Sequence, residues 1–329
     1  MGFGSFGIAL SLLLDRNGCE VTAWQRSAEK TEAVKKNRES AEYMPGIKIP
    51  ESINLSSDIK EAAAGAKMII FAVGSKSIRE TSARLKGIVN KSQILINASK
   101  GLEPGTSLRL SEVISQVFPD NPVAAISGPC HAEELARGMV STHVASSVDI
   151  DIARQIQDVF MSPYFRVYTN PDIVGVELGG ALKNVIALAA GISDGLGFGD
   201  NTKAALMTRG IVEISRLGTA LGAKAETFSG LAGIGDLIVT CTSMHSRNRR
   251  AGILLGQGKS LEETLSEVHM IVEGVNTAKA ALDYAKKTGV VMPITEEVNK
   301  VLFQGESPRK AVENLMLRQK TSESVLLDM

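Results

Sequence analysis

The chain lacks the features that define several large classes of protein. Its 329 residues include only three cysteines, Cys19, Cys130 and Cys241, which lie far apart and form no CxxC pair. Their odd number and wide spacing argue against a disulfide scaffold or a structural zinc site, and they are typical of a reducing compartment. The histidines at positions 131, 143, 245 and 269 also lack the spacing of metal ligands, so we expect no metal site.

An excess of charge of either sign is absent too, because Lys and Arg total 36 and Asp and Glu total 36. With only 4% aromatic residues, this balance gives no reason to expect a nucleic-acid partner. No apolar run approaches the roughly 18 residues of a membrane span; the best candidate, residues 185–192, has Lys183 and Asp194 beside it. The N-terminal residues show no secretion signal. We therefore expect a cytoplasmic protein with no membrane insertion.

The composition and the hydrophobic pattern of the sequence change near residue 170. Before it, short runs rich in Val, Ile and Phe alternate with amphipathic stretches, which is typical of βαβ units. After it, long stretches of Ala, Leu, Gly and Glu predict helices alone. We predict an α/β domain with a doubly wound, mainly parallel sheet over residues 1–170 and an all-helical domain over residues 171–329. The expected strands are 20–24, 68–73, 94–98, 123–127, 143–146 and 166–168, and the expected helices are 8–16, 29–37, 78–89, 108–118 and 152–161, then 174–192, 203–221, 261–268, 277–287 and 295–303.

A glycine-rich turn opens the chain. Gly2, Gly4 and Gly7 form a G-x-G-x-x-G pattern with Ser5 and Phe6 inside it, and an apolar helical stretch follows. The glycines permit a tight turn, close approach of backbone to a pyrophosphate and close helix packing, and the helix start offers N–H groups to the phosphates. Such triplets also occur in ordinary turns, but the helix and the strand that follow favour a Rossmann-like dinucleotide site.

The strand that should precede this turn is missing, since only Met1 stands before Gly2. In a doubly wound sheet that strand is central and covered on both faces. We therefore expect that the sequence begins too late, through a misassigned start or a truncation.

The residues after the second strand bear on the choice of cofactor. An enzyme strict for NAD usually has Asp or Glu there to bind the ribose hydroxyls, whereas this sequence has Gln25 and Arg26. Because an arginine pairs well with a 2′-phosphate, we expect NADP to be accepted beside NAD. The alternative is that Arg26 is a solvent-facing loop residue.

Two features of the helical half are candidates for chemistry. Lys183 lies in an apolar helix, where it either reaches solvent or lines a cleft in which desolvation lowers its pKa and makes it a general acid or base. Asp236 is a candidate carboxylate partner. The cluster that begins at Arg247 and Asn248 suits a phosphate, because guanidinium groups match its oxygens, although a solvated basic face has the same composition. Cys130 is either a nucleophile at a helix start or a small buried residue.

Seven segments, in order, resemble the NAD(P)-dependent glycerol-3-phosphate dehydrogenase family, most closely its bacterial type: GFGSFG, NASKGLEPG, SGPCHAEE, GALKNVIALAAG, GLAGIGDLIVTCTS, SRNRRAG and VEGV. The likeness covers nearly the whole chain. It implies an oxidoreductase that reduces dihydroxyacetone phosphate to sn-glycerol 3-phosphate with NAD(P)H and supplies glycerophospholipid synthesis. The partner is then a small-molecule substrate; the sequence does not decide whether the chain forms a homodimer.

The resemblance also implies the site. It makes Lys183 the proton donor and acceptor, with Asn184 and Thr240 in support, and it places Lys100 against both cofactor and substrate. The implied substrate-binding residues are Lys100, Gly128, Cys130, Asp236, Ser246, Arg247 and Asn248. The implied cofactor-binding residues are Gly2, Gly4, Ser5, Phe6, Gly7, Arg26, Lys100, Ala132, Arg247, Ile271 and Glu273. The chain departs from the family at Phe6, where Trp or Tyr is usual, and at Cys130, where Ser or Thr is usual.

Two other functions remain open. A two-domain hydroxy-acid dehydrogenase has the same build but needs a carboxylate-binding site in place of the Arg247 cluster. A non-catalytic nucleotide-binding module keeps the fold and lacks turnover.

Overall fold

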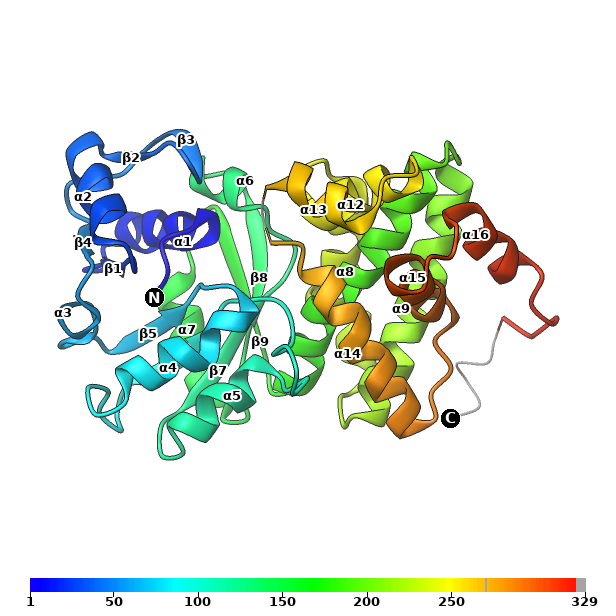
Figure 1. Cartoon of the computed structure of the whole chain (residues 1–329). Helices are drawn as coiled ribbons and strands as arrows, with labels where there is room; N and C mark the ends of the chain where they lie inside the picture. Colours follow the sequence, from blue (N-terminus) through cyan, green and yellow to red (C-terminus); the bar gives the residue numbers. More distant parts are fainter. Residues whose placement is uncertain (270, 324–329) are drawn as a thin grey trace. The chain divides into compact units, whose positions relative to one another are not determined.

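The computed structural model describes residues 1–269 and 271–323 (Figure 1). The chain divides into two compact units, Met1–Glu177 and Leu178–Met329, and the boundary falls inside helix α8 (Ile173–Gly195). The first unit holds strands β1 (Thr22–Trp24), β2 (Glu39–Ser40), β3 (Met44–Lys48), β4 (Asn54–Ser56), β5 (Met68–Phe71), β6 (Ile94–Asn97), β7 (Val123–Ser127), β8 (Ser141–Ser146) and β9 (Phe165–Asn170). Its helices are α1 (Ser5–Arg16), α2 (Ala28–Asn37), α3 (Ile59–Ala63), α4 (Ile78–Leu85), α5 (Leu110–Val117), α6 (Ala132–Ala136) and α7 (Ile150–Phe160).

The strands of the first unit form a mainly parallel sheet. Five of them lie in the order β5-β6-β7-β8-β9, and all neighbours run parallel except β7 and β8. Strand β1 pairs with β4, also in parallel, as a separate two-stranded sheet. All six strands expected from the sequence are present, so the prediction of a mainly parallel α/β fold is confirmed.

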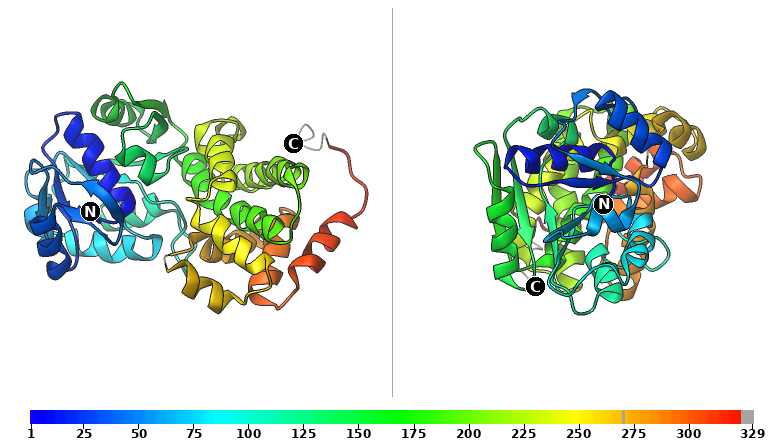
Figure 2. Two further views of the ribbon diagram at one scale, coloured as in Figure 1. Left: turned by 90° about the horizontal axis from the view of Figure 1, so that it is seen from above. Right: turned by 90° about the vertical axis from the view of Figure 1, so that its left-hand side faces the viewer.

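Helices cover both faces of this sheet, as a doubly wound fold requires. One buried cluster joins α1 and α7 to the strands through Ile8, Leu13 and Phe160. A second cluster joins α3, α4 and α5 through side chains such as Ile59 and Leu85. Figure 2 shows the same helices from two further sides. In folds of this kind, ligands bind at the carboxyl ends of the strands.

The second unit contains helices and no strand in the part that the structure describes. After α8 come α9 (Asp200–Ala220), α10 (Ala225–Phe228), a π turn (Leu231–Gly235), α11 (Asp236–Thr242), α12 (Arg247–Gly256), α13 (Leu261–Val268), α14 (Glu273–Thr288), α15 (Pro293–Phe303) and α16 (Pro308–Met316). The all-helical prediction for this half is confirmed.

Helix α8 corrects one prediction. By length and composition this helix is apolar enough to cross a membrane. From the sequence we predict no such run, because Lys183 and Asp194 lie beside its most apolar stretch. However, 89% of its most apolar 18-residue window is buried inside the structure. Gly191 and Gly252 face one another across α8 and α12, and a Cβ on either would come within 2.8 Å of the other's Cα. The helix therefore has the packing of a core helix.

Most of the elements that the sequence did not predict are short. They include the β2–β3 hairpin, strand β4, helix α3 and the helices α10 to α12 and α16. The shortest contain too few repeats of an apolar pattern for periodicity to give a signal. Helices α12 and α16, with 10 and 9 residues, are long enough to have been predicted and were missed.

We expect the stability of the helical unit to depend on the protonation of Glu213. This side chain is 4% exposed and accepts hydrogen bonds from the backbone N–H groups of Ile294 and Thr295 at the start of α15. Burial raises its pKa from 4.5 to about 7, although these hydrogen bonds lower it. The pKa of Glu213 is therefore higher in the folded chain than in the unfolded chain. The stability that depends on its protonated form is fully present below about pH 4.5 and is lost as the pH rises through 7, up to about 3 kcal/mol of unfolding free energy in all.

Urea unfolding at about pH 5 and about pH 8 measures this loss. The Glu213→Gln variant should lose less stability between the two values than the original chain, and the exposed Glu226→Gln variant should behave like the original. An equal loss of unfolding free energy between the two pH values in all three proteins would contradict this role of Glu213.

Candidate active site

The three glycines of the opening turn have different surroundings. Gly2 has a φ of 98°, and a Cβ there would lie 2.7 Å from the Ala72 carbonyl oxygen. A Cβ on Gly7 would lie 2.0 Å from the carbonyl oxygen of Gly2, so the third glycine is needed for packing. A Cβ on Gly4 would meet nothing within 4 Å. Packing inside the chain therefore does not require Gly4, and the backbone there is open to the approach of a ligand.

The start of α1 is suited to phosphate. Gly4 is its N-cap, and no side chain caps it, so the first N–H groups of a 12-residue helix are presented at the turn. The Ser5 hydroxyl donates to the Tyr43 carbonyl at 3.0 Å, and the Phe6 ring stacks on His143 at 6.2 Å between centroids. Both side chains therefore already contact other parts of the protein, and the turn presents mainly backbone groups to a dinucleotide. These residues fit a pyrophosphate.

Arg26 follows the carboxyl end of β1 on the surface. Its guanidinium lies 2.6 Å from the Glu80 carboxylate, and both side chains are 55% exposed. An exposed pair of this kind contributes little to stability, about 0–1 kcal/mol, so the arginine is readily exchanged from Glu80 to another anion.

Lys100 connects two of the predicted segments. Its ammonium donates to the Gly128 carbonyl at 2.8 Å, which brings the loop after β6 against the loop after β7. Gly128 has a φ of 143°, and a Cβ on it would lie 3.0 Å from the backbone of His143. Next along the chain, the half-buried Cys130 has its sulfur 3.6 Å from the His131 carbonyl, and Ala132 begins α6. Four predicted residues therefore lie together at the carboxyl edge of the sheet.

Sequence reasoning missed the residue that anchors this loop. The Glu177 carboxylate, 7% exposed, accepts from the Asn97 side-chain amide at 2.8 Å and from the Arg109 guanidinium at 2.9 Å. The Asn97 amide also donates to the Ser99 carbonyl, next to Lys100. Glu177 thereby fixes the backbone from which Lys100 extends. The available signal was an acidic residue in an otherwise apolar helix, the same signal that singled out Lys183.

Lys183 and Asp236 form a buried ion pair in the helical unit. The Lys183 ammonium donates to the Asp236 carboxylate at 2.5 Å and to the Thr240 hydroxyl at 2.6 Å. The two charged side chains are 6% and 1% exposed. Lys183 therefore does not extend to solvent, and Asp236 is the partner that the sequence suggested. The carboxylate stabilises the ammonium form, which is the form that donates a proton.

Small residues allow this pair to form. Gly179 precedes Lys183 by one helical turn on the same face of α8, and a Cβ there would lie 2.5 Å from the Ala232 carbonyl oxygen. Gly233 is as tightly packed, because its Cβ would lie 2.1 Å from the Phe228 carbonyl oxygen. The π turn can thus lie directly against α8, and α11 begins at Asp236 immediately after it. Widened turns of this kind occur often at functional sites.

The predicted phosphate-binding residues surround the start of α12. Ser246 is its N-cap and accepts from the Arg249 backbone N–H, and the half-buried Arg247 is the first helical residue. The Asn248 side chain is buried: its amide donates to Asn184 at 2.9 Å, and its oxygen accepts from the Gly274 N–H at 2.9 Å. Three of the seven sequence segments therefore meet at Asn248.

The beginning of α14 carries the last two predicted cofactor residues. Ile271 is 41% exposed and Glu273 is the first residue of the helix, directly before Gly274. The contact between Asn248 and Gly274 therefore holds this segment beside the start of α12.

The basic cluster beside Arg247 is not a uniform solvated face. Arg249 lies 2.8 Å from the Asp194 carboxylate, and Lys203 lies 2.8 Å from the same group. All three side chains are no more than 15% exposed, so Arg249 is part of an internal ion-pair network. Nearby, burial raises the pKa of the Cys241 thiol to about 12, so this cysteine stays protonated and unreactive.

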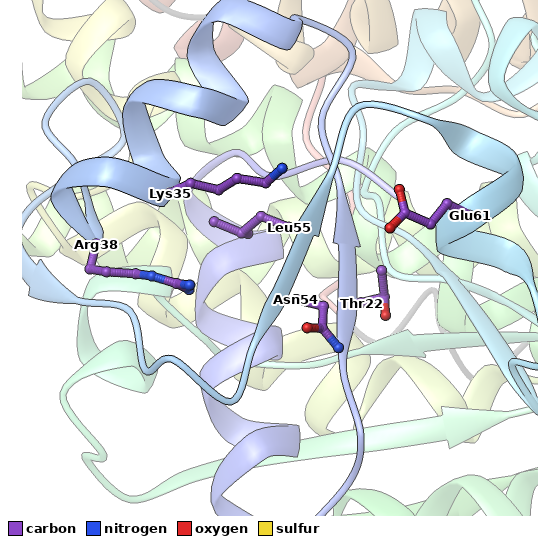
Figure 3. A pocket seen from close by; sticks show the side chains of 6 residues that line it. All are labelled: Thr22, Lys35, Arg38, Asn54, Leu55 and Glu61. Atoms are coloured by element: carbon purple, nitrogen blue, oxygen red, sulfur yellow. The ribbon is translucent and has the colours of Figure 1, made fainter.

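A polar hollow of about 460 Å³ lies near the amino end of β1, the opposite end from Arg26 (Figure 3). Lys35 and Arg38 extend into it from the region of α2 toward β4 (Figure 3). Both cations are paired already, Lys35 with Glu32 and Arg38 with Glu51. None of the residues that line the hollow is among those predicted to bind the nucleotide. Among the residues that the structure describes, no cluster of three or more His, Cys, Asp and Glu side chains has the arrangement of a metal site.

A glycine turn that presents bare helix N–H groups, on a doubly wound sheet, together with a helical unit that buries a lysine–carboxylate pair, defines the class of nicotinamide-dependent oxidoreductases. Comparison with known proteins gives the family. Profiles of the NAD-dependent glycerol-3-phosphate dehydrogenase N-terminus and C-terminus match residues 1–153 and 172–313. The chain belongs to the NAD-dependent glycerol-3-phosphate dehydrogenase family.

Individual relatives agree with this placement. The glycerol-3-phosphate dehydrogenase (NAD(P)+) of Clostridium perfringens is 52% identical over 325 residues, which are 99% of this chain and 98% of the relative. The solved glycerol-3-phosphate dehydrogenase of Coxiella burnetii is 35% identical, with a TM-score of 0.92 over 96% of this chain and 97% of that one. A D-mandelate dehydrogenase is 13% identical with a TM-score of 0.63 over 96% of this chain and 98% of that one, a likeness of fold alone.

The different surroundings of Gly4 and Gly7 give a prediction. Gly4→Ala should leave thermal stability nearly unchanged, because its Cβ meets no protein atom, and should weaken NADPH binding at least about tenfold. Gly7→Ala should instead destabilise the fold by about 3 kcal/mol, because its Cβ would overlap the Gly2 carbonyl.

Fluorescence titration with NADPH and thermal unfolding separate the two effects. If Gly4→Ala binds NADPH as the original chain does, the nucleotide does not approach this turn.

Proposed function

We propose that this chain reduces dihydroxyacetone phosphate to sn-glycerol 3-phosphate with NADPH or NADH and so supplies the backbone of glycerophospholipids. The observation that carries the proposal is the buried ammonium of Lys183, held by Asp236 and Thr240. Burying a charged ammonium this deeply costs desolvation free energy, and in a dehydrogenase fold we assign that ammonium to proton transfer. The names of the relatives supply the substrate.

We further propose that the dinucleotide binds at the Gly2–Gly7 turn and at the start of α1. The open space at Gly4 leaves room for a pyrophosphate against the backbone. Ser5 and Phe6 contribute through their N–H groups, since the Ser5 hydroxyl already bonds Tyr43. Arg26 exchanges its exposed Glu80 partner for the 2′-phosphate, which supports the use of NADPH. When bound, the nicotinamide supplies the hydride that reduces the carbonyl carbon.

The residues of this chain then have distinct tasks. Lys183 donates its proton to the carbonyl oxygen as negative charge develops there, and Asp236 and Thr240 hold its ammonium in place. Lys100, held by the Gly128 carbonyl, is assigned to substrate binding. Arg247 binds the substrate phosphate, and Asn248 holds the start of α12 through Asn184 and Gly274. Phosphate binding orients a carbonyl that is several bonds away.

We propose a cytoplasmic location, in which α8 is a core helix. Its burial, its close glycine contacts with α12 and the dispersed cysteines support this. The substrate and the nicotinamide cofactor are small, charged and water-soluble, as such a location requires.

Replacement of the proposed proton donor is the most direct test of this function. Lys183→Ala should lower kcat by about a hundredfold to ten-thousandfold, the usual contribution of a general acid, with little change in NADPH affinity. The exposed Lys279→Ala, on α14, is the matched control and should keep full activity.

Loss of the lysine also leaves the Asp236 carboxylate buried without its cation, which destabilises the helical unit. The double variant Lys183→Ala/Asp236→Ala should recover thermal stability and remain inactive. A kcat close to that of the original chain in either variant would refute the role of Lys183.

Arg247 distinguishes a phosphate substrate from the carboxylate of a hydroxy-acid dehydrogenase. Arg247→Ala should raise KM for dihydroxyacetone phosphate about tenfold to a hundredfold, because a charge-assisted hydrogen bond to phosphate is lost. The exposed Arg309→Ala on α16 should not change KM. Steady-state kinetics with the phosphate and with a panel of 2-keto acids gives the result; turnover of a keto acid alone would favour the hydroxy-acid enzyme.

A further inference from the structure

The side chain of Arg249 connects three parts of the helical unit. Its Nε donates to the Asp194 carboxylate on α8 at 2.8 Å, and its Nη2 lies 2.8 Å from the same oxygen. Its Nη1 donates to the Thr242 carbonyl at 2.8 Å and to the Met244 sulfur at 3.0 Å. All three nitrogens of a guanidinium that is only 13% exposed are thus engaged. Arg249 therefore ties the segment from Thr242 to Met244 to helix α8.

This segment belongs to the short connection between the proposed proton donor and the proposed phosphate site. Helix α11 ends at Thr242, two residues after Thr240, whose hydroxyl accepts from the Lys183 ammonium. Helix α12 begins at Arg247, so only residues 243–246 separate the two helices. The place of this connection on α8 therefore sets where Arg247 lies with respect to Lys183.

Hydrogen bonds inside the connection hold its turn. The His245 N–H donates to the Ser243 hydroxyl at 3.1 Å, and the Ser246 N–H donates to the Ser243 carbonyl at 3.3 Å. Both bonds join residues of the connection to one another, so they fix its shape and leave its position to other contacts. The bonds from Arg249 supply such a contact, because they join the connection to the Asp194 carboxylate.

Helix α12 itself packs on α8 through backbone. A Cβ on Gly191 of α8 would lie 2.1 Å from the Arg249 carbonyl oxygen, and a Cβ on Gly256 of α12 would lie 2.4 Å from the Ile192 carbonyl oxygen. This close packing does not involve the guanidinium. Removal of the Arg249 side chain therefore releases the connection and leaves the two helices in contact.

We propose that Arg249 is a positioning residue for the phosphate group of the substrate. It acts through the connection between α11 and α12, and it holds Arg247 where a phosphate can bind while the carbonyl of the same substrate reaches Lys183. Small displacements of a binding group are costly in such a site, since about 1 Å can lower turnover about a hundredfold. The inference rests on the proposed function for the identity of the substrate. Within the basic cluster, Arg247 then binds the anion and Arg249 fixes its place.

The ion-pair network around Asp194 offers a matched pair of variants. Arg249→Met removes the guanidinium and keeps an unbranched side chain. Lys203→Met is the control, because Lys203 lies 2.8 Å from the other oxygen of the Asp194 carboxylate and belongs to α9. Each variant takes one cation from Asp194 and leaves it the other, so neither buries an unpaired carboxylate. Only Arg249→Met also removes the bonds to the connection.

The test measures calorimetric binding of inorganic phosphate, and steady-state kinetics with dihydroxyacetone phosphate, in the full chain and both variants. Arg247→Ala gives the level of phosphate binding outside the site. Arg249→Met should weaken phosphate binding about tenfold and raise KM by a similar factor, with a smaller change in kcat, because Lys183 keeps its partners on α11. Lys203→Met should bind phosphate like the original chain. A purely structural role of Arg249 would lower the folded fraction, and so kcat, with KM unchanged.

Unchanged phosphate affinity in Arg249→Met, or an equal loss in Lys203→Met, would overturn the proposal. Phosphate binding by the original chain that is no stronger than that of Arg247→Ala would overturn it as well. If the original chain binds phosphate at this site and does not oxidise NADPH with dihydroxyacetone phosphate, the proposed function fails. The phosphate titration then still decides the role of Arg249, because it requires no turnover.

Discussion

The ion pair between Lys183 and Asp236 is the interaction on which the helical unit and its chemistry both depend. Breaking a buried pair by removing one partner costs about 3–5 kcal/mol, because the remaining charge stays in an apolar interior. The fold surrounds the pair with small residues and a π turn, so that α8 and α11 come close enough for an ammonium and a carboxylate to meet at 2.5 Å. The burial that raises the desolvation free energy of the ammonium also holds its protons in fixed positions.

The α/β unit uses a different principle, since its candidate cofactor site consists mainly of backbone. Ser5 and Phe6 turn their side chains to other parts of the unit, and Gly4 leaves open space above the start of α1. Lys100 is the exception, and its backbone is fixed by Glu177 through Asn97. Of the three glycines of the turn, Gly2 and Gly7 are constrained by the packing of the chain itself, whereas Gly4 is not.

The sequence predicts long, periodic elements well and isolated contacts poorly. All six expected strands and the long helices are present, because burial on one or both faces leaves a repeated apolar pattern. The β2–β3 hairpin and strand β4 are too short to leave one. Asp236 was a candidate partner of Lys183, because a buried lysine requires an anion, but the sequence could not bring the two together. No such requirement pointed to the roles of Glu177 and Arg249, and only the folded chain brings their distant partners to them.

The account is tested most directly by following NADPH oxidation by the purified chain with and without dihydroxyacetone phosphate, and then with 2-keto acids in its place. It predicts oxidation that depends on dihydroxyacetone phosphate and negligible oxidation with the keto acids. Tight NADPH binding with no oxidation in the presence of dihydroxyacetone phosphate would contradict it, and would leave a nucleotide-binding fold without the proposed chemistry.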